Sequence, residues 1–335
     1  MWLSFVLTSL ALGADDAPQP RLDLTELSIP FQRYTTTDSL SRTIVFYLSR
    51  TPMNDPAAKL PVALFIQGSG CQSLFRQSGE QISGGSQNLL VREAKGRARV
   101  LVVEKPGVKF LDVAQRPGTA EGASEEFLRE HTLPRWAEAN RAALRAVWAL
   151  PEIDRSRTLA IGHSEGGIVA ARIAAELPEV THVASLAGGG PTQLFSLAES
   201  RRLPRPDDQP GDAARRAQSI DDEWAKIRQD PDSTTRFWLS HPYRRWSSFL
   251  STSVAAELSR TKARIYLAQG ALDTSVPPTA HDVLVAELLT QGRDVITERI
   301  DGADHGFRKA DDPQGSRAGM QALLGRVCEW FVEKK

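Results

Sequence analysis

One serine lies between two glycines in a short segment that leads from an apolar run into a helical pattern. Residues 161–168 read I-G-H-S-E-G-G-I, with Ser164 near the centre, and apolar residues precede and follow them. This arrangement predicts a strand, a very tight turn and a helix. Such a turn holds its central residue in a strained backbone conformation, so its neighbours must be small. The serine hydroxyl would then be exposed beside free helix N–H groups, which favour negative charge. We therefore predict that Ser164 is a nucleophile.

Strand and helix patterns alternate along most of the chain. This alternation predicts a mostly parallel, doubly wound sheet of about eight strands, with helices on both faces. In open sheets of this kind, ligands bind at the carboxyl ends of the strands, where Ser164 is expected. The predicted strands are 24–31, 43–48, 61–66, 99–103, 158–161, 180–186, 264–268 and 294–300. The polar residues 35–39 are expected to separate the first two strands. The predicted helices are 81–95, 124–150 (interrupted near 133–134), 168–177, 279–291 and 316–334.

Residues 191–261 differ from the rest of the chain. They are rich in Arg, Asp, Pro and Ser, they carry several aromatic residues, and they show no pattern of a buried strand. We interpret this segment as a helical insertion that caps one end of the sheet. The core would then consist of residues 24–190 and 262–335.

Several side chains near the sheet ends and in the insertion have two interpretations. Trp238, Tyr243 and Trp246 are candidates for an acyl-binding pocket, although a small helical segment needs such residues for its own core. Arg244 and Arg245 either bind an anionic substrate group or are solvated helix charges. The stretch 105–107, Lys-Pro-Gly, follows a predicted strand and either borders the pocket or forms a surface turn.

Composition excludes several classes of protein. The chain has 41 basic and 41 acidic residues, so no basic surplus is present to bind nucleic acid. No apolar run reaches the roughly 20 residues that a membrane span needs. Residues 1–13 resemble a secretory signal peptide, which predicts a secreted or periplasmic protein, or a cytoplasmic one if this segment is not a signal. The sequence lacks zinc-site and phosphate-loop patterns, so we expect neither a metal nor a cofactor. It carries no signal for an oligomeric state.

A serine nucleophile needs a base to take its proton and an acid to orient that base. His305 follows the last predicted strand in the glycine-bracketed loop D-G-A-D-H-G-F, and we predict that it is the base. Asp273 follows the preceding predicted strand in G-A-L-D-T-S-V-P, and we predict that it is the acid. The nearby Asp301 and Asp304 are better explained as residues that form turns.

With this order of serine, aspartate and histidine, each just past a strand, the chain resembles the α/β-hydrolase superfamily. The resemblance covers about residues 40–333, and the insertion stands where that family commonly places a cap. It implies an oxyanion hole formed by the backbone N–H of Glu165 and by one from the loop after the third strand, where Ser69 is the first candidate and Gly70 the second. Many family members have His where this chain has Gln67.

The resemblance implies a metal-free serine hydrolase with a small-molecule acyl substrate. The dienelactone-hydrolase, prolyl-oligopeptidase-like and acyl-thioesterase branch is the most similar, and a carboxylic ester is the expected substrate. The alternatives on the same fold are an acyl thioesterase and a serine aminopeptidase. An NAD-dependent oxidoreductase is disfavoured because Ser73 replaces the third glycine of the dinucleotide fingerprint. A non-catalytic binding protein is disfavoured because all three members of the predicted triad are present.

Overall fold

A computed structural model describes residues 20–23, 29–50, 59–309, 312 and 317–333. The predicted signal segment, residues 1–13, lies outside this part of the chain and stays a prediction. None of the helices in the described residues is long and apolar enough to cross a membrane.

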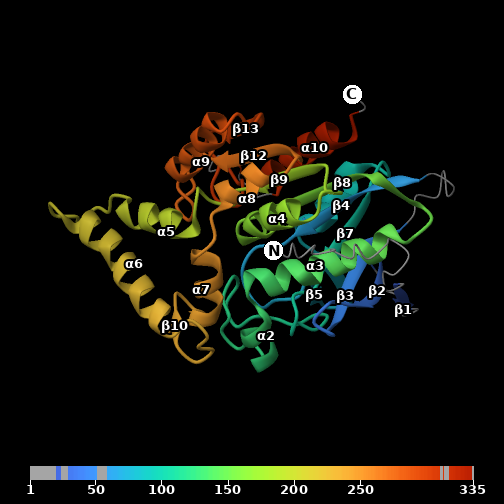
Figure 1. Cartoon of the computed structure of the whole chain (residues 1–335), viewed down its shortest axis with the longest axis horizontal. Coiled ribbons are helices and arrows are strands. Elements are labelled where there is room, and N and C mark those ends of the chain that lie inside the picture. Colours follow the sequence, from blue (N-terminus) through green and yellow to red (C-terminus); the bar gives the residue numbers. More distant parts are fainter. Residues whose placement is uncertain (1–19, 24–28, 51–58, 310–311, 313–316, 334–335) are drawn as a thin grey trace, which may run out of the picture.

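The centre of the molecule is a nine-stranded sheet in the order β1-β2-β3-β7-β4-β8-β9-β12-β13 (Figure 1). The three strands at one edge are antiparallel to their neighbours, and the strands from β7 to β13 run parallel to one another. The carboxyl ends of these parallel strands therefore meet at one edge of the sheet. The strands are β1 (Arg21–Asp23), β2 (Phe31–Thr37), β3 (Thr43–Ser49), β4 (Leu60–Ile66), β7 (Arg99–Val103), β8 (Ile153–His163), β9 (His182–Leu186), β12 (Arg264–Gly270) and β13 (Val295–Ile300).

Helices cover both faces of the sheet, as the alternation of strands and helices predicts. The two faces form separate apolar clusters, and strand β4 shows why: Leu64 and Ile66 belong to one cluster, while Ala63 and Phe65 belong to the other. Burying each large apolar side chain stabilises the fold by about 1.5–3 kcal/mol. One face carries α3 (Leu133–Trp148), α4 (Glu165–Glu176), α8 (Val254–Arg260) and α9 (Pro278–Thr290), and the other carries α1 (Ser86–Ala94) and α10 (Ala318–Val332).

Two predicted elements are wrong at the amino-terminal edge. Residues 35–39 were expected to separate two strands, but β2 runs through Thr37 and pairs with both β1 and β3. Its threonines favour a strand because their branched side chains fit a half-buried pleated surface. Residues 81–84 were expected to begin a helix, but they form β6 (Gln81–Gly84), which pairs with β5 (Phe75–Ser78) in a hairpin.

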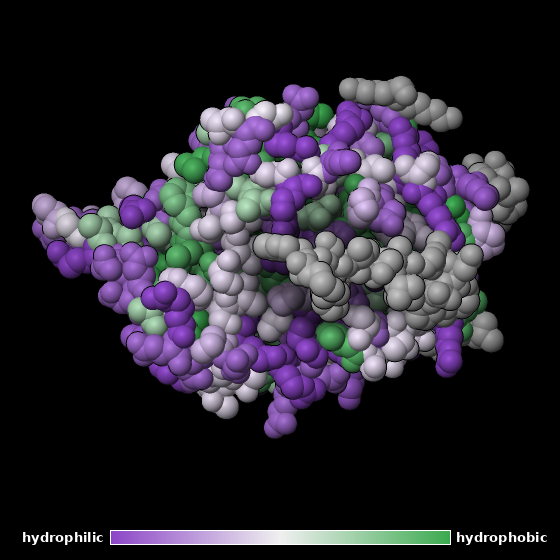
Figure 2. Space-filling model, in the orientation of Figure 1, coloured by the Kyte–Doolittle hydropathy of each residue, from purple (hydrophilic) through white to green (hydrophobic). Residues whose placement is uncertain are grey.

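The segment 191–261 is largely helical. It contains α5 (Gln193–Arg202), α6 (Asp212–Gln229) and α7 (Tyr243–Leu250), followed by α8, whose Val254, Ala255 and Leu258 join the main core. Figure 1 shows α6 at the margin of the molecule, far from the sheet. Only three of its residues are buried, and Figure 2 shows a mostly hydrophilic surface on this projecting arm.

Candidate active site

Ser164 occupies the tight turn between β8 and α4. Its φ is 55° and its ψ is −126°, a backbone conformation that residues other than glycine rarely adopt. Its N–H donates to the carbonyl of Leu186 on the neighbouring strand, at 2.9 Å. The turn is so close that a Cβ at Gly162 would lie 2.0 Å from the carbonyl oxygen of Gly166. The glycines that flank Ser164 therefore allow the strained turn that the sequence predicts.

We expect Gly166→Ala to lower the free energy of unfolding by about 3 kcal/mol or more. The added methyl group would lie 2.2 Å from the carbonyl oxygen of Ile66, and neither backbone can move without breaking the elbow. Urea denaturation measures the loss. The matched control is Gly292→Ala, where φ is 72° but nothing lies within 4 Å, so only about 1 kcal/mol of backbone strain is expected. Equal losses in the two variants would contradict the steric explanation.

The structure brings Ser164, His305 and Asp273 together although they are far apart in the sequence. His305 Nδ1 lies 2.8 Å from Asp273 Oδ2, and His305 Nε2 lies 3.0 Å from Ser164 Oγ. An ionised carboxylate can only accept, so Nδ1 carries the proton and Nε2 is left to accept from the serine hydroxyl. The three side chains thus form one continuous hydrogen-bonded chain.

Asp273 is fully buried, and its carboxylate has a partner in every direction. Oδ1 accepts the backbone N–H groups of Ser275 at 2.8 Å and Val276 at 2.9 Å. Oδ2 accepts from Gln269 Nε2 at 2.8 Å, in addition to His305. These bonds fix the carboxylate because any rotation would leave buried donors unpaired.

The loop that carries His305 is held by its own turn and by the elbow. Asp304 Oδ1 accepts the N–H groups of Gly306 at 2.8 Å and Arg308 at 2.9 Å, so it forms the turn that the sequence predicts for it. His163 Nε2 donates to the carbonyl oxygen of His305 at 2.8 Å. The residue before the predicted nucleophile therefore ties the elbow to the loop of the predicted base.

The loop after β4 approaches the elbow closely. A Cβ at Gly68 would lie 3.4 Å from Ser164 Cβ, so a substituent here would press on the serine. Ser69 follows, and its carbonyl accepts from Gln72 Nε2 at 3.1 Å. Gly70 has a φ of 104°, which glycine adopts without strain. This loop and the amino end of α4, which begins at Glu165, are the places where the sequence predicts oxyanion donors.

A buried group of charged side chains lies beneath the elbow. The carboxylate of Glu165 is bound by Arg245, whose Nε lies 3.0 Å from Oε2, and by His131, whose Nε2 lies 2.9 Å from Oε1. Lys105 Nζ lies 3.6 Å from the same Oε1. The side chains of all four residues are at most 2% exposed.

The charges in this group follow from burial and from proximity. Burial alone would raise the pKa of Glu165, but Arg245, His131 and Lys105 outweigh it and hold that pKa well below its ordinary value. Burial lowers the pKa of His131 to about 4, so its imidazole is neutral at pH 7. Burial also lowers the pKa of Lys105 to about 8, which leaves the ammonium mostly charged at pH 7. With Arg245 charged, one carboxylate faces two cations, and the group carries a net positive charge.

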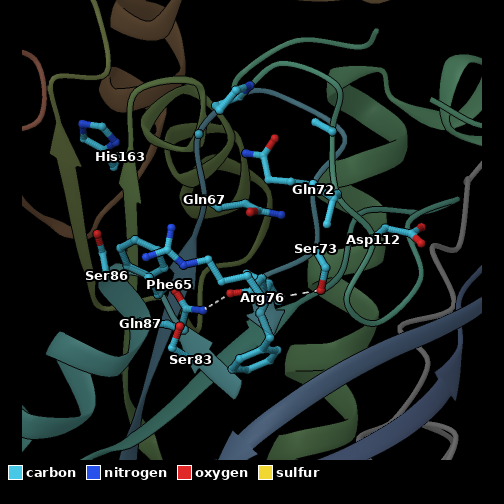
Figure 3. A pocket seen from close by; sticks show the side chains of 18 of the residues that line it. Phe65, Gln67, Gln72, Ser73, Arg76, Ser83, Ser86, Gln87, Asp112 and His163 are labelled. Carbon is cyan, nitrogen blue, oxygen red and sulfur yellow. Dashed lines mark hydrogen bonds between the residues drawn. The ribbon is translucent and has the colours of Figure 1, made fainter. Parts of the chain in front are cut away.

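A cavity of about 370 Å³ opens beside the elbow, and both Gly68 and His163 line it (Figure 3). Figure 3 shows the side chains of Gln67, Gln72 and Arg76 pointing toward the same space. Gln67 Nε2 and Gln72 Oε1 are buried and have no hydrogen-bond partner among the residues that the structure describes. The cavity therefore offers polar groups close to the elbow, although Ser164, Asp273 and His305 are not among the residues that line it.

The aromatic residues predicted as a possible acyl pocket pack elsewhere. Tyr243 and Trp246 are buried in a small cluster with Ile227 and Leu250, and Trp238 packs against it. None of the three aromatic residues is among those that line the cavity beside Gly68. They form part of the core of the helical segment, and their role in an acyl pocket stays a prediction.

Three charged or titratable residues of the site were missed or misjudged from the sequence. Arg245 is neither a solvated charge nor an exposed clamp, because it is buried against Glu165, and Arg244 instead pairs with Asp232. Lys105 begins a turn, in which the N–H of Val108 donates to its carbonyl at 2.9 Å, but this turn is buried rather than on the surface. His131, which also binds Glu165, was not singled out from the sequence. The only sequence signal for Lys105 was its position just after a parallel strand, at the edge where ligands bind.

Comparisons with known proteins give the family and the fold. The profile of the alpha/beta hydrolase family matches residues 83–315. No curated protein sequence matches the chain.

Several solved structures share the fold. The uncomplexed acylaminoacyl peptidase of Pyrococcus horikoshii is 17% identical, with a TM-score of 0.60, over 95% of this chain and 42% of that one. A puromycin-hydrolyzing peptidase of Mycobacterium tuberculosis is 18% identical, with a TM-score of 0.58, over 93% of this chain and 42% of that one. Est1E of Butyrivibrio proteoclasticus is 16% identical, with a TM-score of 0.54, over 90% of this chain and 99% of that one. This chain thus spans less than half the length of the two peptidases, and identities this low show the fold alone. The family profile covers more than half of the 335 residues, and so the chain belongs to the alpha/beta hydrolase family.

Proposed function

We propose that this protein is a serine hydrolase that cleaves carboxylic esters through an acyl-enzyme. The observation that carries the proposal is the unbroken hydrogen-bonded chain from Asp273 through His305 to Ser164, with contacts of 2.8 and 3.0 Å. A base held this way can accept the serine proton at Nε2 while Asp273 stabilises the imidazolium that results. A serine hydroxyl without such a partner is a poor nucleophile.

The proposed reaction has two halves. Ser164 Oγ attacks the ester carbonyl, and its proton moves to His305 Nε2. The tetrahedral intermediate then breaks its bond to the alcohol, which leaves with the proton from His305, and the acyl group remains on Ser164. A water molecule next gives its proton to His305 and attacks the acyl-enzyme, after which Ser164 Oγ leaves and recovers that proton.

Negative charge develops on the carbonyl oxygen in both halves of this reaction. In our proposal the backbone N–H groups of Glu165 and Ser69 donate to that oxygen. Losing one such donor typically costs about 10²–10³ in kcat. The net positive charge of the buried group beneath the elbow favours the same oxyanion, since charges interact strongly where water is excluded.

The charges around the cavity favour an ester over an aminopeptidase substrate. An aminopeptidase must bind a free ammonium group, for which carboxylates are the natural partners. Among the described residues, two guanidinium groups line the cavity, those of Arg76 and Arg317, and one carboxylate, that of Asp112. This balance repels an ammonium group and tolerates a neutral or anionic substrate. In this proposal the segment 191–261 is the cap over the site, and it limits the length of the acyl group.

The test is a panel of substrates with one readout, kcat/KM. It comprises p-nitrophenyl esters from acetate to laurate, an acyl-CoA series, and aminoacyl p-nitroanilides. We expect kcat/KM for the esters to exceed that for the anilides by about 100-fold or more, because the leaving group and the charge balance both favour the esters. Among the esters, we expect those with shorter acyl chains to have the higher kcat/KM, because the proposed cap limits the length of the acyl group. The Ser164→Ala protein serves as the blank for each substrate.

Two outcomes would redirect the proposal. Hydrolysis of the anilides alone would make the protein a peptidase, and a preference for acyl-CoA over esters of the same acyl group would make it a thioesterase. Turnover that survives in the Ser164→Ala blank would refute the mechanism for any of these substrates.

A further inference from the structure

Lys105 lies two residues after the end of β7, and its side chain is fully buried beneath the loop that follows β4. Its Nζ donates to the carbonyl oxygens of Gly68 at 2.7 Å and Gly70 at 2.8 Å. The ammonium also lies 4.5 Å from the ring centre of Trp136, a cation–π contact that helps to hold it in place. This lysine therefore binds the residues on both sides of Ser69 in the sequence.

The first of these bonds acts on Ser69 through a single peptide unit. The carbonyl of Gly68 and the N–H of Ser69 belong to the same peptide group, which is planar and trans. The two bonds point in opposite directions, so anchoring the carbonyl on Lys105 aims the N–H away from the buried lysine. A charged donor also polarises the peptide group that it binds, which makes the N–H at its other end a stronger donor. Gln72 adds a second anchor on the carbonyl of Ser69.

The same ammonium contacts the other half of the proposed oxyanion hole. It lies 3.6 Å from the carboxylate of Glu165, whose backbone N–H is the second proposed donor. Arg245 and His131 hold that carboxylate from other directions. One side chain is thus bonded to the β4 loop and paired with the first residue of α4, the two segments that must keep a fixed separation around an oxyanion.

We propose that Lys105 is a positioning residue that sets the spacing and direction of the Ser69 and Glu165 N–H groups. This inference rests on the proposed function, and it names a residue to which the reaction itself assigns no step. Burying an ammonium is costly, and an apolar side chain of similar volume would fill the space as well. A role in orienting two donors explains why a lysine occupies this position.

The test replaces Lys105 by Met, which is unbranched and one atom shorter and removes the charge and the donors, and by Arg, which retains both. Fluorophosphonate titration counts the competent active sites, and kcat is then expressed per titrated site. We expect Lys105→Met to lower kcat about 100-fold with KM changed less than about threefold, because donors matched to the oxyanion act on the transition state. Arg should recover at least a tenth of the wild-type kcat.

A second readout distinguishes positioning from a loss of folded protein. Trifluoromethyl ketones add to a catalytic serine and form an oxyanion, so their affinity should weaken in Lys105→Met by the same factor as kcat/KM. If Lys105→Met does not fold, Lys105→Gln, which keeps an N–H donor and lacks the charge, carries the same test.

The matched control is Arg99→Met, which removes another buried cation at the opposite end of β7, where Arg99 Nε binds the carbonyl of Ser49. It should lower stability and leave kcat per titrated site unchanged.

The inference fails if kcat per titrated site in Lys105→Met stays within twofold of wild type, or if the affinity of that variant for the ketone does not change. It also fails if Arg99→Met lowers kcat per site as much as Lys105→Met. A wild-type protein that the fluorophosphonate does not label at Ser164 would overturn the proposed function instead, so the two failures are distinguishable.

Discussion

Replacement of Ser164 by Ala is expected to abolish labelling by a fluorophosphonate and to lower kcat for p-nitrophenyl esters by about 10⁵-fold or more. The variant lacks the oxygen that forms the acyl-enzyme, and losses of this size are typical when the nucleophile of such a relay is removed. The fold should persist, because the substitution removes one hydroxyl and leaves the glycines of the elbow in place. Labelling on a gel, ester turnover and thermal unfolding together measure the effect.

A matched serine provides the control for this experiment. Ser185 lies on β9 and is buried, and its Oγ is so close to Gly167 that a Cβ there would meet it at 2.4 Å. Ser185→Ala should keep both labelling and activity. Persistent labelling of Ser164→Ala would assign the nucleophile to another residue, and loss of labelling in both variants would indicate a general structural effect.

Replacement of Asp273 by Asn is expected to lower kcat by about 10³–10⁴-fold at pH 7 with little change in KM. The backbone N–H groups of Ser275 and Val276 require an oxygen at the position of Oδ1, so the new amide must place its NH₂ where Oδ2 now accepts from His305. Two donors would then face each other, and the imidazole would carry its proton on Nε2. In that tautomer it cannot take the proton of Ser164.

Asp304→Asn is the comparison for this variant. Asp304 is only one residue from His305, but its carboxylate accepts from Gly306 and Arg308 rather than from the imidazole. Steady-state kinetics of the two variants should differ by at least about 100-fold. If Asp304→Asn proves the more damaging, Asp273 is not the acid that orients His305.

The convergence of Ser164, Asp273 and His305 was predictable because each residue has its own local signal. A serine between close glycines predicts the elbow, and the loops that carry Asp273 and His305 each follow a strand with a clear apolar run. Parallel strands bring their carboxyl ends to one edge of the sheet, so residues more than 100 positions apart converge there. The hydrogen bonds between them follow from the topology.

The buried charges were not predictable in the same way. Arg245 lies in a polar helical segment, where a charged residue is usually solvated, and its burial depends on Glu165, which is 80 positions away in the sequence. Likewise, β2 is a strand because β1 and β3 pair with it on both sides, while its three consecutive threonines resemble a polar connection when considered alone. Long-range partners override local patterns in both cases.

The ion pair between Arg245 and Glu165 joins helix α7 of the segment 191–261 to the residue that follows Ser164. A chimera in which this segment is exchanged for a foreign one would remove the guanidinium from the buried Glu165 carboxylate and leave it with only Lys105 and His131 as partners, beside Ser164. Exchange of this segment is therefore constrained: a new segment keeps the charge balance around Glu165 only if it supplies its own cation at this place, or if position 165 becomes neutral at the same time. Covariation between positions 165 and 245 among relatives would be the evolutionary trace of that constraint.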